Sequence, residues 1–229
     1  MSRFHWRRKR AALALLPVAS MLFTTGGLAA AQTAPAPAPE DGTEAATSGG
    51  RADSKVKLRV TRHVMAGDKV KMRGKAAPGG RRWVTVTIGG RKVRSVRTRK
   101  DGTFRLRWST PSTGVFKAKA VARGAEHAKR ARSRSQTIHS YRSSHASYFG
   151  PGLYGNRTAC GKTLTPSIIG VANKSLPCGT KVVFRYRGRT ARARVIDRGP
   201  YAAGREWDLT AALKAKLGFG STGMVLSTK

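Results

Sequence analysis

Several segments between residues 53 and 142 alternate strictly between basic and apolar side chains. The clearest are residues 55–60, 69–73 and 116–121. A period of two residues is typical of antiparallel strands that bury one face and expose the other. Turn signals such as Asp101-Gly102 separate these segments, and this dipeptide is typical of tight hairpins. Residues 53–142 are therefore predicted to form an all-β domain of about seven short strands, arranged as an immunoglobulin-like sandwich. Its aromatic residues are expected in the core, rather than on an exposed platform for sugars: Trp83, Phe104, Trp108 and Phe116.

The first 31 residues have the features of a secretory signal. Basic residues at positions 3–10 precede an apolar run over residues 11–23, and Ala29-Ala30-Ala31 fits a cleavage site before Gln32. Because the run is short for a membrane span, we expect cleavage and no stable membrane anchor. The mature chain is predicted to be secreted, extracellular or associated with the cell wall. Residues 32–52 are rich in Ala, Pro and Gly and are predicted to be a linker.

The chain is strongly basic, with 46 Lys and Arg against 10 Asp and Glu and a formal net charge of +36. Such a charge concentrates polyanions near the surface. Residues 53–142 hold much of it, and for an exported protein the expected partners of this domain are anionic wall polymers. The alternative is a solvated basic face that keeps the chain soluble. A nucleic-acid binder rests on charge alone, without interleaved exposed aromatic residues, so no specific nucleic acid is expected.

The chain has two cysteines, Cys160 and Cys178. In an exported protein a disulfide between them is the natural expectation, and closing this loop contributes on the order of 3 kcal/mol. The alternative is a catalytic cysteine with His145 as base, although nothing in the sequence places that pair together. No Cys/His cluster has the spacing of a zinc site. Neither a metal nor a cofactor is therefore expected.

Between His145 and the C-terminus the acidic residues are Asp197, Glu206 and Asp208. Any acid/base chemistry by a carboxyl group in this second domain therefore depends on one of these three. Asp197 follows an apolar pair and precedes a Gly-Pro turn, which places its carboxyl at the end of a strand. Glu206 is expected on the surface. Asp208 precedes a helix predicted over residues 211–217, so its alternative role is to interact with the helix N-terminus.

The rest of residues 145–229 indicates short strands around that one helix. Strands are expected over residues 181–187, 190–196 and 224–227. Thr210 is predicted as the N-cap of the helix and Gly218 as its C-terminal stop. The later G-x-G-x-x-G match follows a helix instead of a strand, so it does not indicate a dinucleotide site.

The motifs of this region resemble a known family. In order, they read A-S-Y-F-G-P-G, T-A-C-G, G-V-A-N-K-S-L-P-C-G-T-K-V, V-I-D-R-G-P-Y and G-R-E-W-D-L-T. This succession resembles the RlpA-like (rare lipoprotein A-like) double-psi β-barrel domain in its secreted actinobacterial form. The resemblance covers residues 145–229 and implies a six-stranded barrel with one short helix and a groove that accepts glycan. Relatives of this barrel include peptidoglycan lytic transglycosylases, expansins and some cellulases.

By position, the resemblance implies Asp197 as the acid/base and Asp208 as a second acidic site residue. Lys162 stands where many members have Glu, and Asn173 stands where they have His; both positions are associated with the groove. The groove contacts expected here are Asn173, Tyr148, Tyr154, Tyr201 and Arg198.

A lytic transglycosylase needs only one carboxyl group, whereas ordinary glycoside hydrolysis usually takes two. One acid can protonate the glycosidic oxygen and then accept the proton of the muramic acid 6-hydroxyl as it closes on C1. One physical objection concerns Asp197: an acid catalyst needs a raised pKa, and Arg194 and Arg198 beside it would lower that pKa. In the alternative, structural role, Asp197 pairs with Arg198 or accepts backbone N–H bonds.

The sequence therefore supports two functions. The favoured one is a peptidoglycan lytic transglycosylase that acts on glycan strands through Asp197. The alternative is a non-catalytic protein that binds peptidoglycan and anionic wall polymers, which the replacements at Lys162 and Asn173 favour. A monomer is expected in either case.

Overall fold

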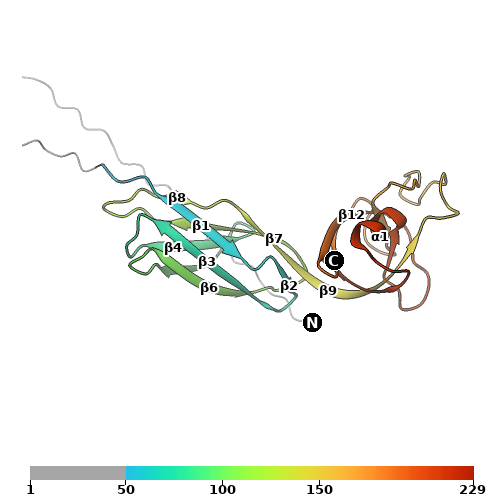
Figure 1. The fold of residues 1–229 in the computed structure, drawn as a ribbon, viewed down its shortest axis with the longest axis horizontal. Helices are drawn as coiled ribbons and strands as arrows, with labels where there is room; N and C mark the ends of the chain where they lie inside the picture. The colour runs from blue at the N-terminus through green and yellow to red at the C-terminus, as the bar shows by residue number, and fades with distance from the viewer. Residues whose placement is uncertain (1–49) are drawn as a thin grey trace, which may run out of the picture. The chain divides into compact units, whose positions relative to one another are not determined.

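The computed structural model describes residues 50–229. The predicted signal peptide, residues 1–31, and nearly all of the predicted linker, residues 32–52, lie outside the described residues. The described chain consists of strands with one short helix, as Figure 1 shows, which confirms the all-β fold class. Within residues 50–229, no helix is long and apolar enough to cross a membrane.

The first part of the chain forms two sheets, which are antiparallel except for the parallel pair β2–β9. One sheet has the order β1-β3-β6, and in the other β9, β7, β4 and β5 are neighbours, with β2 beside β9 and β8 beside β7. The strands are β1 (Lys55–Val60), β2 (His63–Met65), β3 (Lys69–Ala77), β4 (Trp83–Ile88), β5 (Arg91–Arg97), β6 (Thr103–Ser109), β7 (Gly114–Ala122), β8 (Ala131–Arg132) and β9 (Gln136–Phe149).

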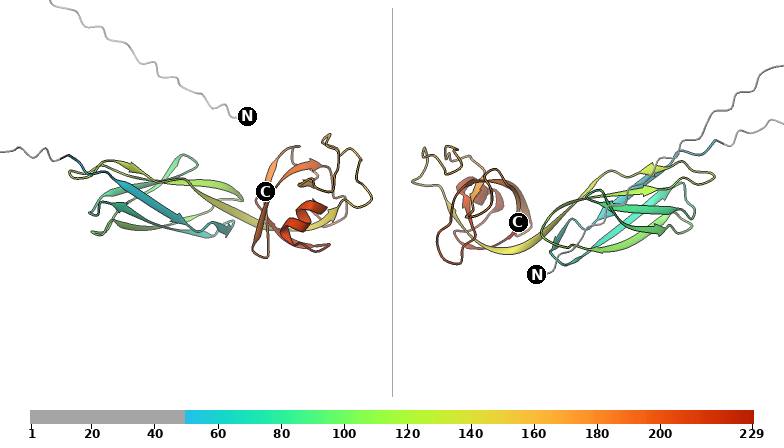
Figure 2. Two further views of the ribbon diagram at one scale, coloured as in Figure 1. Left: turned by 45° about the horizontal axis from the view of Figure 1, so that its top comes forward. Right: turned by 180° about the vertical axis from the view of Figure 1, so that it is seen from behind.

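The two sheets enclose a common apolar core, and Figure 2 shows them as two layers. The alternation of basic and apolar residues in the sequence matches the alternation of exposed and buried side chains in the structure. In β1, Val56 and Leu58 are buried while Lys55, Lys57 and Arg59 are exposed. The strands β2 and β8 were not predicted, because segments of 3 and 2 residues show no period. The likeness of this sandwich to immunoglobulin domains stays a prediction.

One of the four aromatic residues predicted for the core is outside it. Trp83 is 49% exposed, because β4 turns Val84 and Val86 toward the core and Trp83 has the opposite parity. Phe104 is buried. Trp108 and Phe116 are partly buried and pack edge to face, with ring centroids 5.3 Å apart.

The second part of the chain is a closed barrel of six strands. Their order is β9-β13-β10-β12-β11-β14, and β14 returns to β9. The pairs β9–β13 and β10–β12 are parallel, and the other pairs are antiparallel. Besides β9, the strands are β10 (Gly170–Ala172), β11 (Lys181–Tyr186), β12 (Arg189–Asp197), β13 (Trp207–Thr210) and β14 (Gly223–Ser227).

The helix α1 (Ala211–Leu217) has the predicted bounds and caps. Thr210 accepts a hydrogen bond from the N–H of Leu213, and Gly218 ends the helix in the left-handed conformation with φ 63°. Leu213 and Leu217 are fully buried and join the barrel core around Trp207. The sequence therefore contained the whole local signal for this element.

Strand β9 is continuous through both parts. Its first residues pair with β7, from Gln136 to Ser140, and its later residues pair with β14, from Arg142 to Ala146. The boundary predicted between residues 142 and 145 therefore falls inside one strand.

Candidate functional site

The two candidate carboxylates lie on the strands that flank β10. Ala172 of β10 pairs with Asp197 of the parallel strand β12 and with Asp208 of the antiparallel strand β13. Because neighbouring strands lie about 4.8 Å apart, the two aspartate backbones are separated by roughly 10 Å. The sequence indicated each aspartate singly. The two aspartates lie opposite the same residue because β10 pairs with both of their strands, and a strand of three residues is too short to show an alternating pattern in the sequence.

Asp197 is held by backbone donors. It is half-buried at the end of β12, and its Oδ1 accepts hydrogen bonds from the N–H of Ala159, at 2.8 Å, and of Arg198, at 2.8 Å. This matches one of the structural roles considered from the sequence. These two bonds fix the direction of the carboxyl group within its loop.

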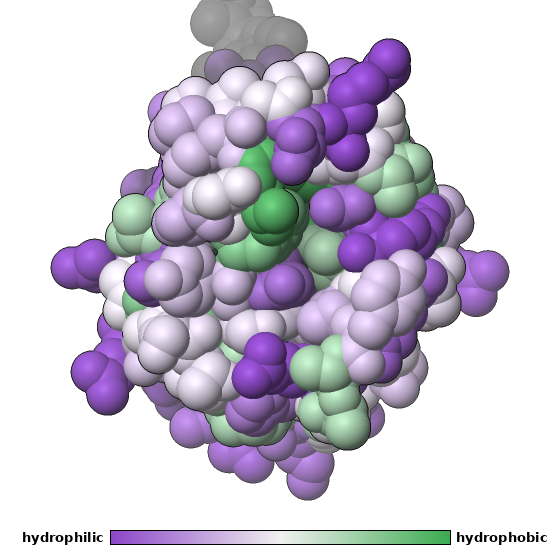
Figure 3. Space-filling view, turned by 90° about the vertical axis from the view of Figure 1, so that its right-hand side faces the viewer, coloured by the Kyte–Doolittle hydropathy of each residue, from purple (hydrophilic) through white to green (hydrophobic). Residues whose placement is uncertain are grey.

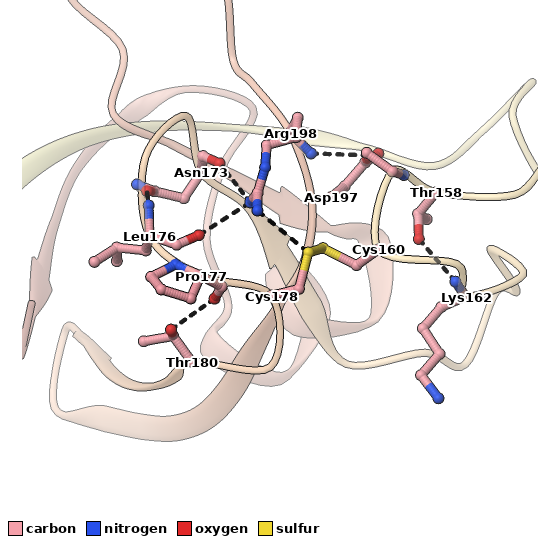
Figure 4. The surroundings of a disulfide bond; sticks show 11 residues. Thr158, Cys160, Lys162, Asn173, Leu176, Pro177, Cys178, Thr180, Asp197 and Arg198 are labelled. Carbon is pink, nitrogen blue, oxygen red and sulfur yellow. Dashed lines mark hydrogen bonds between the residues drawn. A yellow bond between two sulfur atoms is a disulfide. The ribbon is translucent and has the colours of Figure 1, made fainter.

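The guanidinium of Arg198 points away from Asp197. It donates hydrogen bonds to the carbonyls of Asn173, at 3.3 Å, and Leu176, at 3.0 Å, and lies 3.3 Å from Cys178 Sγ, as Figure 4 shows. The ion pair with Asp197 considered from the sequence is therefore not formed. Arg198 instead ties the strand end that carries Asp197 to the loop over residues 173–178. Arg194 also turns aside and donates to the Gly179 carbonyl at 3.3 Å.

The predicted disulfide between Cys160 and Cys178 is present, with the two Cα atoms 5.6 Å apart. The disulfide connects two loops next to Asp197 (Figure 4). The loop with Cys160 also contains Ala159, whose N–H donates to Asp197, and the loop with Cys178 contacts the guanidinium of Arg198. A cysteine in a disulfide is no nucleophile, so the alternative of a catalytic cysteine with His145 is wrong.

Asp208 has a different environment. It is half-buried in β13, and burial raises the pKa of its carboxyl, opposed by the hydrogen bond from Ser147 and the charge of Arg205 and assisted by the charge of Asp197. The Ser147 hydroxyl donates to Asp208 Oδ1 at 2.9 Å. Thr210, not Asp208, caps the helix. Ser147 was not predicted as a site residue; it reaches Asp208 because β9 and β13 pair in parallel.

Asn173 is 5% exposed, and its amide is engaged within the protein. Its Nδ2 donates to the carbonyl of Glu206 at 3.2 Å, and its Oδ1 accepts from the N–H of Ser175, at 3.2 Å, and of Leu176, at 2.9 Å. Glu206, expected on the surface, is partly buried and forms an ion pair with Arg142. The side chain of Asn173 therefore shapes this loop.

A pocket of about 360 Å³ opens beside Asn173. Its wall includes Lys174, Leu176, Arg205 and Glu206. The pocket therefore borders the residues that lie between Asp197 and Asp208 in the chain, and it offers both charged and apolar contacts.

The three candidate tyrosines differ in how far they are exposed to solvent. Tyr201 is 81% exposed and Tyr154 is 39% exposed, whereas Tyr148 is half-buried and Lys214 Nζ lies 3.7 Å from the centre of its ring. Lys162 is exposed, and its N–H donates to the Thr158 hydroxyl oxygen at 3.1 Å. The face of the molecule in Figure 3 is mainly hydrophilic around a small apolar patch. Of the three candidate tyrosines, Tyr201 and Tyr154 are thus the exposed ones.

The second part of the chain is thus a closed barrel of six strands with two parallel strand pairs and one helix. The family model for lytic transglycolase matches residues 143–226. This domain is an RlpA-like double-psi β-barrel. The resemblance drawn from the sequence motifs is thereby confirmed for this part of the chain.

Curated relatives match about a third of this chain. The probable endolytic peptidoglycan transglycosylase RlpA of Synechocystis is 38% identical over 81 residues, which are 34% of this chain and 25% of that protein. The Aquifex aeolicus protein of the same name is 35% identical over 83 residues, 35% of this chain and 37% of its own. The endolytic peptidoglycan transglycosylase RlpA of Campylobacter jejuni is 34% identical over 80 residues, 34% of this chain and 29% of its own. The chain thus spans between a quarter and two fifths of the length of these relatives.

Among solved structures, the CARDB domain of a Pyrococcus furiosus protein matches 38% of this chain and 87% of its own. Its TM-score is 0.30 at 12% sequence identity, which is too low to support an argument about either part.

Proposed function

We propose that the RlpA-like barrel cleaves peptidoglycan glycan strands in a lytic transglycosylase reaction, with Asp197 as the acid/base. The observation that carries this proposal is the position of Asp197 and Asp208 on either side of Ala172 in β10. The names of the three relatives support the same reaction class. The signal predicted over residues 1–31 would deliver the barrel to the cell wall.

The proposed reaction needs one proton donor that becomes a proton acceptor. Protonated Asp197 donates its proton to the glycosidic oxygen, and the bond between this oxygen and C1 of the muramic acid breaks. The 6-hydroxyl oxygen of the same sugar then bonds to C1, and its proton returns to Asp197. The products are a 1,6-anhydro end and a strand with a free hydroxyl, so no water is consumed and the acid is regenerated.

The hydrogen bonds of Asp197 distinguish its two carboxyl oxygens. Within the described chain they fall on Oδ1, from Ala159 and Arg198. We therefore assign the proton transfer to Oδ2. The Arg198 guanidinium donates to carbonyl oxygens and forms no ion pair with Asp197.

We assign to Asp208 the stabilisation of positive charge that develops at C1 as the glycosidic bond breaks. Its carboxyl is half-buried beside Ser147, and a charge at a partly desolvated position acts more strongly than one in water. The second carboxyl thus assists the reaction without activating water.

The test is digestion of purified sacculi by the mature chain from Gln32, with anhydro-muropeptides measured by mass spectrometry. We expect these products from the wild type, a loss of at least two orders of magnitude with Asp197→Asn, and a smaller loss with Asp208→Asn, since general acid–base groups contribute about 10²–10⁴-fold. Asp53→Asn is the matched control, because Asp53 is exposed and belongs to the sandwich region. Equal product yields from the wild type and Asp197→Asn would refute the assignment.

A second function is favoured by one observation. The Asn173 amide, at the position where many family members have His, is engaged by Glu206, Ser175 and Leu176. Such a barrel could hold glycan without cutting it. Binding of sacculi by the wild type with no anhydro product at any enzyme concentration would favour this non-catalytic function.

A further inference from the structure

The outer surface of the sheet β1-β3-β6 is an array of cations, which we name the basic face. All outward residues of β1 from Lys55 to Arg59 and of β3 from Lys69 to Lys75 are Lys or Arg, and β6 adds Arg105 and Arg107. These side chains are exposed, while the residues between them are mostly buried in the sandwich core.

The strand register aligns these charges in rows. Arg59 pairs with Arg73, and Arg73 pairs with Arg105, so three arginines lie side by side across the sheet. Lys57 pairs in the same way with Lys75. Like charges directly opposite one another in an antiparallel pair destabilise the sheet. This arrangement therefore carries a cost to the fold.

Within residues 50–229, no ion pair offsets this cost on the basic face. The ion pairs of residues 50–229 are Lys129–Asp53, Arg142–Glu206 and His127–Glu126, and all of them lie off the basic face. Asp101, near one end of the face, accepts hydrogen bonds from the N–H and hydroxyl of Thr103. The rows of cations are thus left to be neutralised by something outside the described chain.

The basic face is hollowed between β3 and β6. A groove of about 270 Å³ is lined by Lys71, Arg73, Arg105 and Arg107, with Met72 and Leu106 at its base. The groove follows the β3–β6 pairing, in which Lys71 is opposite Arg107 and Arg73 is opposite Arg105. Four cations therefore converge on a space that a chain of anions can enter.

We propose that the basic face binds a linear phosphodiester polymer of the cell wall. Its charges recur about every 6.8 Å along a strand and about every 4.8 Å across the sheet, which suits a polymer with one anion in each short repeat. The planar fork of Arg matches the oxygens of phosphate. The outward residues of this sheet include no aromatic ring in the described chain, so the face lacks the stacking platform of single-stranded nucleic-acid sites.

This binding is independent of the proposed cleavage, because it uses another part of the chain. It extends the sequence-based expectation of an anionic partner to one sheet face and one ligand chemistry. Its role would be to hold the chain against a polymer anchored beside the glycan strands.

The test measures binding of a purified poly(glycerol phosphate) wall polymer to the mature chain by isothermal titration at several salt concentrations. The test variant is Arg59→Gln/Arg73→Gln/Arg105→Gln, which removes the central row. The matched control is Arg91→Gln/Arg94→Gln/Arg97→Gln, which removes three exposed arginines from β5 in the other sheet. Both variants lose the same net charge.

We expect the test variant to bind at least about tenfold more weakly and the salt dependence of log K to fall by about 2 in slope, by the counterion rule for single strands. The control should stay within about threefold of the wild type. Asp197→Asn should bind like the wild type, which separates this proposal from the proposed cleavage. The test variant should also melt no lower than the wild type, since it loses like-charge contacts.

Three results would overturn the proposal. Equal weakening by the two triple variants would show that net charge, and not this face, attracts the polymer. Unchanged binding by the test variant would place the site elsewhere. Tighter binding of the wild type to duplex DNA than to the wall polymer at the same salt, lost in the test variant, would assign the face to nucleic acid instead.

Discussion

Removal of the disulfide Cys160–Cys178 tests how the loops around Asp197 are held. The two cysteines are separated by 18 positions in the sequence. In the loop-closure treatment, a crosslink across such a loop lowers the entropy of the unfolded chain by an amount that corresponds to about 3 kcal/mol at 25 °C. We therefore expect the double variant Cys160→Ala/Cys178→Ala to lose about 3 kcal/mol in its free energy of unfolding.

The measurement is urea unfolding of the wild type and variants, followed by circular dichroism and tryptophan fluorescence. The single variants Cys160→Ala and Cys178→Ala are the internal control, because each of them already lacks the bond. All three variants should therefore unfold at similar urea concentrations. Anhydro-muropeptide yield should fall as well, since Ala159 donates to Asp197 directly before Cys160.

Two outcomes would refute this reasoning. A double variant within about 1 kcal/mol of the wild type would show that the unfolded loop is already restricted, against the loop-closure estimate. Full activity in that variant would show that Asp197 keeps its position without the crosslink.

Three further predictions concern other parts of the molecule. Thr210→Val should lower the free energy of unfolding in urea by about 2–4 kcal/mol, because removal of the Thr210 hydroxyl leaves the buried N–H groups of Leu213 and Gly170 without their acceptor. Thr210→Ser keeps a hydroxyl and should cost less; an equal cost for the two variants would contradict this explanation. Burial raises the pKa of Asp208, so cleavage should fall as pH decreases through that raised pKa and the carboxyl loses its charge; Asp208→Asn should remove this acidic limb, and an unchanged pH profile would contradict the role. Burial lowers the pKa of His139 from 6.5 to about 4. As the pH falls from 6.5 to about 4, His139 is therefore protonated in the unfolded chain but not in the folded one, and the free energy of unfolding should decrease. His139→Phe should flatten this pH dependence of stability, and an equal pH dependence in both proteins would refute the assignment.

The elements with a complete local signal were predictable from the sequence. The helix follows from Thr210, its apolar positions and Gly218, all of which lie within the element. The strands β1, β3 and β7 follow from the alternation of basic and apolar residues, because one face of each strand is buried and the other is solvated. Trp83 was expected in the core because it is aromatic. It lies outside the core because it belongs to the set of alternate residues of β4 that face away from it.

The geometry of the site depended on contacts between distant segments. Asp197 and Asp208 come to one level because β10 pairs with β12 and β13, and a strand of 3 residues has no readable period. Ser147 reaches Asp208 through the parallel pairing of β9 and β13. The direction of the Arg198 guanidinium was also beyond the sequence, since its acceptors are carbonyl oxygens of another loop.

The proposed reaction cleaves glycan strands by internal closure of the 6-hydroxyl on C1 and not by attack of water. The most direct measurement is digestion of purified sacculi by the mature chain in water enriched in oxygen-18, followed by mass spectrometry of the released muropeptides. The one-carboxyl mechanism through Asp197 predicts 1,6-anhydro ends that are lighter than hydrolysis products by one water and carry no heavy oxygen. New reducing ends formed in place of anhydro ends would contradict it, and so would anhydro products formed equally well by Asp197→Asn.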